Sequence, residues 1–303
     1  MDLNGAVSPE ISIVIPAVNG WADLDRCLSA LERERPTTEI EVIVPERCGD
    51  KVRRLSAQKF PWARIIPVSS ETTIPQMRAV GIKEAHAPTV AIIEDHTVVV
   101  PGWARQMVNA RTDQERVVGA GLVNTATDSI VDWAAWLCEY SHLAGPAPVG
   151  AVDGMHGNHT AYDRRLLVEH RDVVESGKWE DALHNAIRQN GVELYSRPDI
   201  IAGHEKHYTV GEYTSQRFLY SRAYAAMRAS GATPLRKFVL GLMAFVLPPV
   251  LFYRIVSRVW RGRLYREHLL PSLPLLAIFV VSWALGEVAG AWFGDGGALA
   301  KVA

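Results

Sequence analysis

The segment 89–93 narrows the possible folds more than any other part of this sequence, because an apolar run ends there abruptly at Glu94, Asp95 and His96. A short run without charge is typical of a strand that is buried on both faces, as the strands of a parallel sheet are. Open α/β sheets bind their ligands at the carboxyl ends of such strands. We therefore expect these three polar side chains to lie in a binding site.

The three side chains that follow this strand suit a divalent cation. Carboxylate oxygens with one imidazole are ligands for Mg²⁺ or Mn²⁺, and beside phosphates these ions neutralise oxygens that gain charge as a bond breaks. One interpretation of the triplet is therefore a metal site for a nucleotide diphosphate. A second interpretation also remains open, in which the triplet is only a polar strand end followed by a helix cap.

Other segments of the first half alternate between strand and helix patterns. Apolar runs predict strands at 11–15, 40–44, 64–68, 89–93 and 117–123. Helices are predicted at 21–33, at 75–86 and from Pro101 onward, where apolar residues recur at helical spacing or proline takes a first helical position. Strands that alternate with helices indicate an α/β fold with a doubly wound, mostly parallel sheet and helices on both faces.

Composition limits the functional classes. The 303 residues carry a formal net charge of -1, and no Lys/Arg stripe with interleaved aromatic residues occurs before residue 225, which argues against a nucleic-acid binder. Cys27, Cys48 and Cys138 are far apart and lack metal-ligand spacing, so we expect reduced thiols in a cytoplasmic protein. The first ten residues lack the basic and apolar regions of a cleavable signal peptide, so we expect no export of the soluble part.

The end of the sequence is apolar, with charges confined to short clusters after residue 238. The run 238–253 is shorter than the roughly 20 residues of a spanning helix and contains Pro248 and Pro249, so we expect a re-entrant or interfacial hairpin. The run 269–293 is long enough to span, with Glu287 as its only charge. Arginine clusters flank the first run on both sides and basic flanks prefer the cytoplasm, which favours a single crossing by 269–293 over two crossings.

We therefore divide the chain into a soluble domain, 1–225, and a membrane-associated helical region, 226–303. Gly286 and Gly290 have the spacing that permits close contact between helices. Glu287 lies between these two glycines. We expect its carboxylate to reach the lipid headgroups, and a functional role within the membrane is the less favoured alternative. A membrane tail on a soluble domain indicates a substrate in or near the bilayer, and a plain anchor is the alternative.

A predicted helix near residue 180 begins with a carboxylate. Leu183 and Ile187 lie on its apolar side, and Asp181 and His184 lie on the other side. Asp181 either caps the helix, with a stabilisation of about 0.5–2 kcal/mol, or serves chemistry on the solvent side. His204 follows in a polar segment, where an isolated histidine is more often ordinary surface than a ligand.

Five motifs resemble those of family 2 glycosyltransferases, which have the GT-A fold, a nucleotide-binding α/β sheet. They are the strand and loop 13–19, the helix 76–82, the acidic triplet with the later segment 101–103, the loop 157–164, and the pair Glu180 and Asp181. Each motif is weak alone, and their order and spacing make the resemblance specific. It covers residues 11–225 and implies a GT-A domain followed by C-terminal membrane helices.

The resemblance implies roles for the matching residues. Asp181 corresponds to the catalytic base, with Glu180 beside it. The cation, Mg²⁺ or Mn²⁺, is implied to bind Asp95 and His96, with His204 to complete the shell. The implied substrate-binding residues are Pro16, Asn19, Glu46, Arg78, Glu94, Gly157 and Asn158.

The function implied by the resemblance is that of an inverting, divalent-metal-dependent glycosyltransferase at the cytoplasmic side of the cell membrane. It would move a sugar from a nucleotide diphosphate to a lipid-linked or glycan acceptor. The alternative is a non-catalytic nucleotide-sugar-binding or scaffold subunit, because Val18, Gly20, Pro45 and His96 depart from the family pattern. No Gly-x-Gly-x-x-Gly follows the first strand, which argues against a dinucleotide-dependent oxidoreductase.

Overall fold

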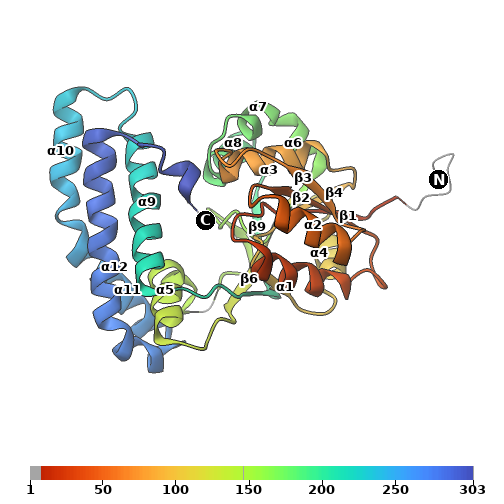
Figure 1. Ribbon diagram of the computed structural model, residues 1–303, viewed down its shortest axis with the longest axis horizontal. Helices are drawn as coiled ribbons and strands as arrows, with labels where there is room; N and C mark the ends of the chain where they lie inside the picture. Colours follow the sequence, from red (N-terminus) through yellow and green to blue (C-terminus); the bar gives the residue numbers. More distant parts are fainter. Residues whose placement is uncertain (1–7, 146, 303) are drawn as a thin grey trace. The chain divides into compact units, whose positions relative to one another are not determined.

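The structure is a computed structural model that describes residues 8–145 and 147–302. The chain separates into two compact units, which Figure 1 shows as a sheet with its helices and a group of helices. The α/β unit contains residues 8–123 and 147–205, and the helical unit contains 124–145 and 206–302. This division differs from the boundary expected at 225, because the helix 210–228 packs within the helical unit.

The α/β unit is built on one sheet, whose described strands follow the order β3-β2-β1-β4-β8-β6-β9-β5, with β7 paired to β9. The strands are β1 Ile11–Val14, β2 Ile40–Glu46, β3 Arg64–Pro67, β4 Thr89–Ile92, β5 Thr97–Val99, β6 Val117–Asn124, β7 Gly150–Val152, β8 Thr160–Asp163 and β9 Leu194–His204. The five strands expected from the sequence all form.

Only the first half of this sheet is parallel. β1 pairs in parallel with β2 and with β4, and β2 pairs in parallel with β3. The later strands pair antiparallel, β8 with β4 and β6, and β9 with β5 and β7. The expectation of a mostly parallel sheet therefore holds for β1 to β4 alone, and the sheet as a whole is mixed.

Helices cover both faces of the sheet, as the sequence predicts. On one face α1 (Trp21–Glu32), α2 (Asp50–Lys59) and α4 (Trp103–Ala110) bury their apolar sides in a core with β1, β2 and β4. On the other face lie α3 (Ile74–Lys83), α6 (Arg164–Glu169), α7 (Arg171–Glu175) and α8 (Glu180–Gln189). Figure 1 shows these two layers of the α/β unit.

The helical unit consists of α5 (Ile130–Tyr140), α9 (Val210–Arg228), α10 (Pro234–Ala244), α11 (Leu247–Gly262) and α12 (Arg266–Phe293), with short 3-10 turns at Ser141–Leu143 and Leu299–Lys301. α12 is its central helix and packs on α5, α9, α10 and α11. A Cβ placed on Gly286 or on Gly290 would collide with the backbone of α9. The small residues of α12 thus permit close contact with a helix of the same chain, as their spacing predicts.

Buried charges in the helical unit are paired. Glu287 forms an ion pair with Arg228 of α9 and accepts a hydrogen bond of 3.2 Å from the Trp283 ring nitrogen. Arg217 pairs with Glu139 at 3.1 Å and lies against the rings of Tyr213, Tyr220 and Trp283. Glu287 is therefore a packed and partnered side chain, whereas the sequence suggested a lone carboxylate that reaches the headgroups.

One helix in the described part of the chain, α12, has the length and hydropathy to cross a membrane. The pair α10 and α11 passes the same test only if it is counted as one span, and it is bent by 50°. The bend falls at residues 245–246, next to Pro248 and Pro249, where the sequence predicts a kink. Length and composition alone support these spans, and 44% of the apolar window of α12 is buried inside the protein.

Replacement of Gly286 by valine should destabilise the helical unit, because the new side chain meets Ser221 and the Phe218 carbonyl oxygen of α9. Overpacking of this kind costs about 1–3 kcal/mol. We expect a lower midpoint of thermal unfolding, measured by circular dichroism. Ala277→Val, on the exposed side of the same helix, is the matched control. An equal loss in both variants would contradict the contact and point to the poor helix propensity of valine.

Candidate metal centre and active site

The Asp95 carboxylate fixes the loop that follows β1. Its two oxygens accept hydrogen bonds from the backbone N–H groups of Val18 and Asn19, at 2.7 and 2.8 Å, and from the Asn19 side chain at 2.6 Å. This loop stands beside the triplet because β1 and β4 are parallel neighbours whose carboxyl ends lie at one edge of the sheet. The sequence assigned Asp95 to the cation, and the structure turns it toward the loop.

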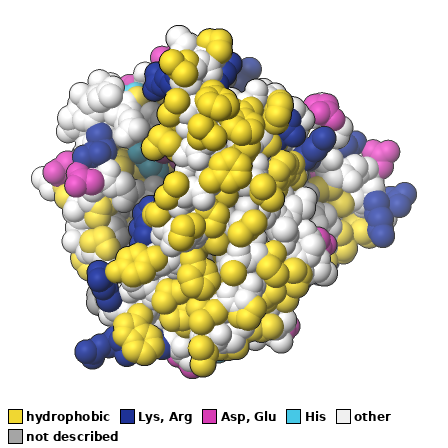
Figure 2. Space-filling view, turned by 90° about the vertical axis from the view of Figure 1, so that its left-hand side faces the viewer, with side chains coloured by type: hydrophobic (Ala, Val, Ile, Leu, Met, Phe, Trp, Pro, Cys, Tyr) yellow, Lys and Arg dark blue, Asp and Glu magenta, His cyan; other side chains and the backbone are white. Residues whose placement is uncertain are grey.

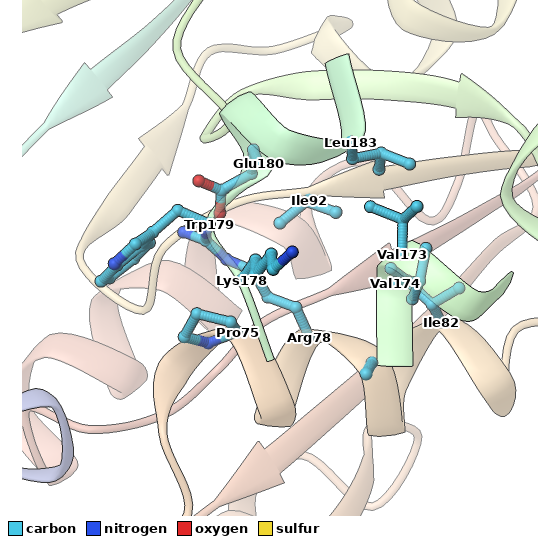
Figure 3. Close-up of a pocket in the computed structure, with 11 residues that line it drawn as sticks. Pro75, Arg78, Ile82, Ile92, Val173, Val174, Lys178, Trp179, Glu180 and Leu183 are labelled. Atoms are coloured by element: carbon cyan, nitrogen blue, oxygen red, sulfur yellow. Dashed lines mark ion pairs between the residues drawn. The ribbon is translucent and has the colours of Figure 1, made fainter. Parts of the chain in front are cut away.

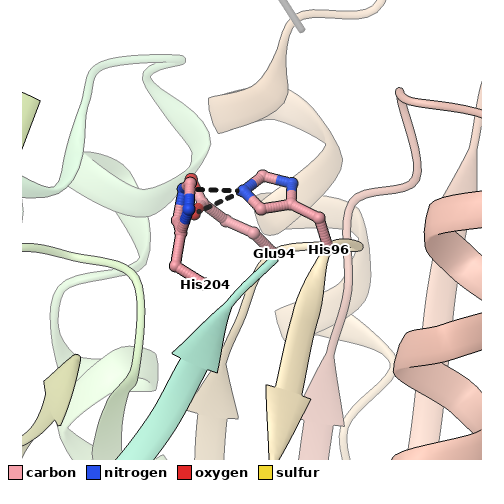
Figure 4. A group of neighbouring side chains, drawn as sticks. All are labelled: Glu94, His96 and His204. Carbon is pink, nitrogen blue, oxygen red and sulfur yellow. Dashed lines mark hydrogen bonds and ion pairs between the residues drawn. The ribbon is translucent and has the colours of Figure 1, made fainter. Parts of the chain in front are cut away.

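Glu94 and His96 meet His204, which ends β9, and the Nδ1 atom of His96 lies 3.2 Å from both Asp95 and the Asn19 side chain. The Nε2 atoms of His96 and His204 are 3.1 Å apart, and His96 Nε2 lies 3.3 Å from a carboxylate oxygen of Glu94. Figure 4 shows the three side chains converging on one point. Residues 94–97 form a turn, which is closed by a hydrogen bond of 3.0 Å from the Thr97 N–H to the Glu94 carbonyl oxygen and lets Glu94 and His96 approach each other.

Electrostatic coupling sets the charges of this group. Burial lowers the pKa of His96, but the carboxylates of Glu94 and Asp95 outweigh burial and raise this pKa to about 9. Burial raises the pKa of Glu94, and the nearby His96 and His204 nevertheless hold it well below its usual range. Burial and the charge of His96 hold the pKa of His204 well below its usual range. Without a cation, His96 is therefore charged and His204 is neutral.

The three residues fit a divalent cation. One ligand atom from each of Glu94, His96 and His204 lies within 4.8 Å of the other two. Two imidazole nitrogens that face each other closely are arranged as ligands of a common ion would be. Nitrogen ligands suit transition metals, whereas Mg²⁺ prefers oxygen ligands. The group thus offers one carboxylate and two imidazoles to a divalent cation.

A second polar pair adjoins the metal group. The Asn158 side chain donates a hydrogen bond of 2.8 Å to Glu94. Its neighbour Gly157 has no Cβ, and a Cβ there would collide with the side chain of Glu180. Glu180 forms an ion pair with the buried Arg78 of α3. The loop 157–158 thus connects the metal group to the Arg78–Glu180 pair, and this close approach requires glycine at 157.

The Arg78–Glu180 pair lies in a small pocket between α3, α7 and the start of α8. Figure 3 shows Glu180 and Trp179 at one end and the apolar side chains of Ile82, Val173 and Leu183 at the other. The Arg78 guanidinium also lies 5.7 Å from the centre of the Trp179 ring. The pocket therefore combines a charged end with an apolar floor.

Three predicted site residues lie outside this cluster. Asp181 is exposed in the first turn of α8 and does not line the pocket, so its neighbour Glu180 is the carboxylate that enters it. Glu46 is buried and accepts hydrogen bonds of 2.6 Å each from Gly49 and Arg53, which hold the start of α2. Pro16 is buried just after β1, where it supports the loop held by Asp95.

The sequence did not predict a set of buried histidines behind the metal group. His184, placed on the polar side of its helix by periodicity, is buried and lies 2.8 Å from the Tyr162 hydroxyl. Burial lowers the pKa of His184 to about 4 and that of His159 to about 3. His159 lies 3.3 Å from the Thr97 hydroxyl. The high frequency of histidine in the segment 156–204 was the only signal in the sequence.

Comparison with known proteins identifies sequence relatives of this chain. Residues 12–169 match the model of "Glycosyl transferase family 2". The chain is 26% identical over 156 residues to human polypeptide N-acetylgalactosaminyltransferase 18, and this covers 44% of the chain and 26% of that protein. The chain thus spans about a quarter of the length of this curated relative.

One solved structure is similar in fold, and a second gives a weaker match. Residues 1–349 of S. aureus TarS give a TM-score of 0.52 at 11% identity, with 92% of this chain and 90% of that chain covered. The mannosyltransferase PcManGT from Pyrobaculum calidifontis, in complex with GDP-Man and Mn²⁺, gives 0.48 at 16% identity, with 94% and 74% covered. The α/β unit has the GT-A type of fold, and the chain belongs to glycosyl transferase family 2.

Proposed function

We propose that this glycosyltransferase moves a sugar from a nucleotide diphosphate to a lipid-linked or glycan acceptor, with inversion at the anomeric carbon. The observation that carries the proposal is the continuous set of contacts from Glu94 to Glu180, which consists of the hydrogen bond between Asn158 and Glu94 and the close packing of Gly157 on Glu180. This set puts a candidate cation group and a candidate base in one cluster of the α/β unit. The arrangement is what a displacement at a sugar with a diphosphate leaving group requires.

Glu94, His96 and His204 would hold the divalent cation, for which we propose Mn²⁺. A cation bound there supplies positive charge next to the diphosphate, whose oxygens gain negative charge as the bond to the sugar breaks. Asn158 orients Glu94 through its side-chain amide. Asn19 and the loop held by Asp95 would lie next to the nucleotide, since they stand at the carboxyl ends of β1 and β4.

Glu180 is our candidate for the base that takes the proton of the acceptor hydroxyl. It enters the pocket at the start of α8, and Arg78 fixes its position. Asp181, the residue that the family resemblance implies, faces solvent in this structure. As the base takes its proton, the acceptor oxygen would bond to the anomeric carbon on the side opposite the departing nucleoside diphosphate, and this single displacement inverts the anomeric configuration.

The acceptor is proposed to be in or near a membrane, with the α/β unit on the cytoplasmic side of the cell membrane. This proposal rests on the apolar character of the helical unit, which belongs to the same chain as the catalytic residues. Attachment to the bilayer would raise the local concentration of a lipid-linked acceptor.

Glu180→Gln should abolish transfer and leave nucleotide-diphosphate binding nearly unchanged. A positioned base typically contributes about 10²–10⁴-fold in rate, and the amide cannot accept the proton. We would measure product formation from a panel of UDP- and GDP-sugars, and nucleotide binding by calorimetry. Retained binding separates a chemical defect from a folding defect that follows from loss of the ion pair with Arg78.

Asp181→Asn is the matched variant, because it neutralises the adjacent carboxylate without touching the pocket. It should keep most of the wild-type rate. The opposite pattern, with loss only in Asp181→Asn, would restore the assignment implied by the family resemblance. Nucleotide-sugar binding by the wild-type chain without turnover on any acceptor would favour the non-catalytic subunit.

Removal of a cation ligand should abolish Mn²⁺ binding. His204→Ala and Glu94→Gln each remove one of the three converging ligands, whereas His207→Ala removes a histidine three residues further along the chain that pairs with Asp132 instead. Calorimetric titration with Mn²⁺ should show binding in the wild type and in His207→Ala only. Loss of binding in Asp95→Asn that equals the loss in His204→Ala would show that Asp95 is itself a ligand.

Mn²⁺ affinity should rise with pH until about pH 9, because the cation requires a neutral His96 and the pKa of this residue is about 9 without it. Well below that pKa we expect a gain of about tenfold per pH unit. The protonated form of His96 also stabilises the cation-free fold; this contribution is complete below the ordinary pKa of 6.5 and is lost as pH rises through about 9. Calorimetry in buffers of different ionisation enthalpy should detect the released proton, and affinity independent of pH would contradict this account.

A further inference from the structure

The helical unit exposes a broad apolar face. Figure 2 shows hydrophobic side chains gathered across it, with Lys and Arg toward its margins. The face is defined here by six exposed side chains from α10, α11 and α12: Leu235, Met243, Val246, Val250, Leu270 and Leu285. Two of them are about three-quarters exposed, Leu235 at 73% and Leu270 at 75%. Contiguous apolar surface of this kind marks a protein or membrane contact.

α12 contributes one side to this face and keeps the other side for the protein. Its exposed apolar side chains Leu270, Ile278, Val281 and Leu285 recur at intervals of three, four or eight residues, which places them on one stripe. Phe279 and Gly286 lie on the opposite side of α12 and are buried against α9. The helix is therefore apolar on both sides for two different reasons. One side packs against the other helices of the unit, and the other side is available for contact at the surface.

The charges around the apolar face have one sign. The segment 229–266 contains seven Lys or Arg residues and no Asp or Glu. Arg254, Arg258 and Arg261 of α11 are exposed. Basic side chains beside an apolar surface are attracted to the anionic headgroups of a bilayer. A protein partner of neutral or basic surface would leave these charges without compensation.

An aromatic side chain lies among these charges. Trp260 is 62% exposed, and the Arg266 guanidinium lies 4.9 Å from the centre of its ring. Tryptophan is enriched at the boundary between hydrocarbon and water, because its ring is apolar and its N–H is polar. This position predicts that α11 lies at headgroup level.

The environment of α12 argues against a crossing of the bilayer. Phe279, in the middle of α12, packs edge to face against Tyr213 of α9, and Ser282 donates a hydrogen bond of 2.7 Å to the Thr214 carbonyl of α9. These residues belong to the first turns of α9, where Glu212 is exposed and bonds to Thr209. If α12 spanned the membrane, this carboxylate would lie near the bilayer centre, where a charge is expensive.

We propose that the helical unit lies in the interface of an anionic bilayer, with α10, α11 and the exposed side of α12 in contact with lipid and with no segment crossing it. α9 then stays on the water side of α12, where its polar residues remain hydrated. This proposal concerns the mode of attachment and holds for any sugar donor. It replaces the single crossing by 269–293 that the sequence suggests.

The test uses the full chain, made by cell-free synthesis with vesicles of phosphatidylcholine alone or mixed with phosphatidylglycerol. We expect flotation with both vesicle types, stronger with the anionic one, and release of the chain by alkaline carbonate. Full resistance to carbonate, with the segment 266–293 protected from added protease, would establish a spanning helix and overturn the proposal.

Variants separate the electrostatic contribution to vesicle binding from the contribution of the apolar side chains. Arg254→Gln with Arg258→Gln should lower binding to anionic vesicles by about 30-fold and leave binding to neutral vesicles unchanged. The matched control, Lys51→Gln with Arg54→Gln, removes two exposed charges of α2 and should have no effect. Met243→Ser with Val246→Ser should weaken binding to both vesicle types by roughly tenfold or more for each side chain.

Two further results would overturn the proposal. One is absence of flotation together with a chain that forms dimers by light scattering, because the apolar face would then be covered by a second copy. The other is flotation that Met243→Ser with Val246→Ser leaves unchanged, since a surface that contacts lipid cannot lose two of its apolar side chains without effect. Activity assays with a soluble acceptor keep these outcomes distinct from failure of the glycosyltransferase proposal.

Discussion

Three hydrogen bonds to the Asp95 carboxylate, from Val18 and Asn19, hold the carboxyl ends of β1 and β4 in register. His96 lies between this loop and β9, because its Nδ1 is 3.2 Å from both Asp95 and the Asn19 side chain and its Nε2 faces His204. Glu94 completes the group with His96 and His204. The arrangement of the candidate metal centre thus depends on the hydrogen bonds that the Asp95 carboxylate accepts from Val18 and Asn19.

The site contains many buried ionisable groups, and each is stabilised by a neighbour. His96 is charged between two carboxylates, and Asp95 and Glu94 have lowered pKa values because His96 outweighs their burial. His159 and His184 remain neutral because burial lowers the pKa of each. This balance lets the protein keep ligands and charges in place before substrate arrives, so little reorganisation is required on binding.

The periodicity of apolar residues predicts much of the fold, but it does not predict the contacts that the side chains of the site make. The strands before residue 123, the triplet and the helix at residue 180 all lie where the sequence places them. Periodicity does not report side-chain direction in the turn after a strand, so it could not show that Asp95 contacts the loop after β1 while Glu94 faces His96 and His204. It also placed His184 on the polar side of α8, although Tyr162 of β8 buries it. Antiparallel pairing of β8 and β9 depends on distant partners that no local pattern encodes.

The polypeptide passes between the two units three times, at residues 123–124, 146–147 and 205–206. Helix α5 is therefore an insertion in the α/β sequence that packs with distant helices: Tyr213 of α9 donates a hydrogen bond to the Ala135 carbonyl, and Phe279 of α12 lies in the same apolar cluster. A shortened chain that stops before α9 would keep α5 but would lack α9 and α12, which provide the apolar neighbours of α5. Its newly uncovered surface would favour aggregation, so an excised catalytic portion would require a short loop in place of residues 124–146.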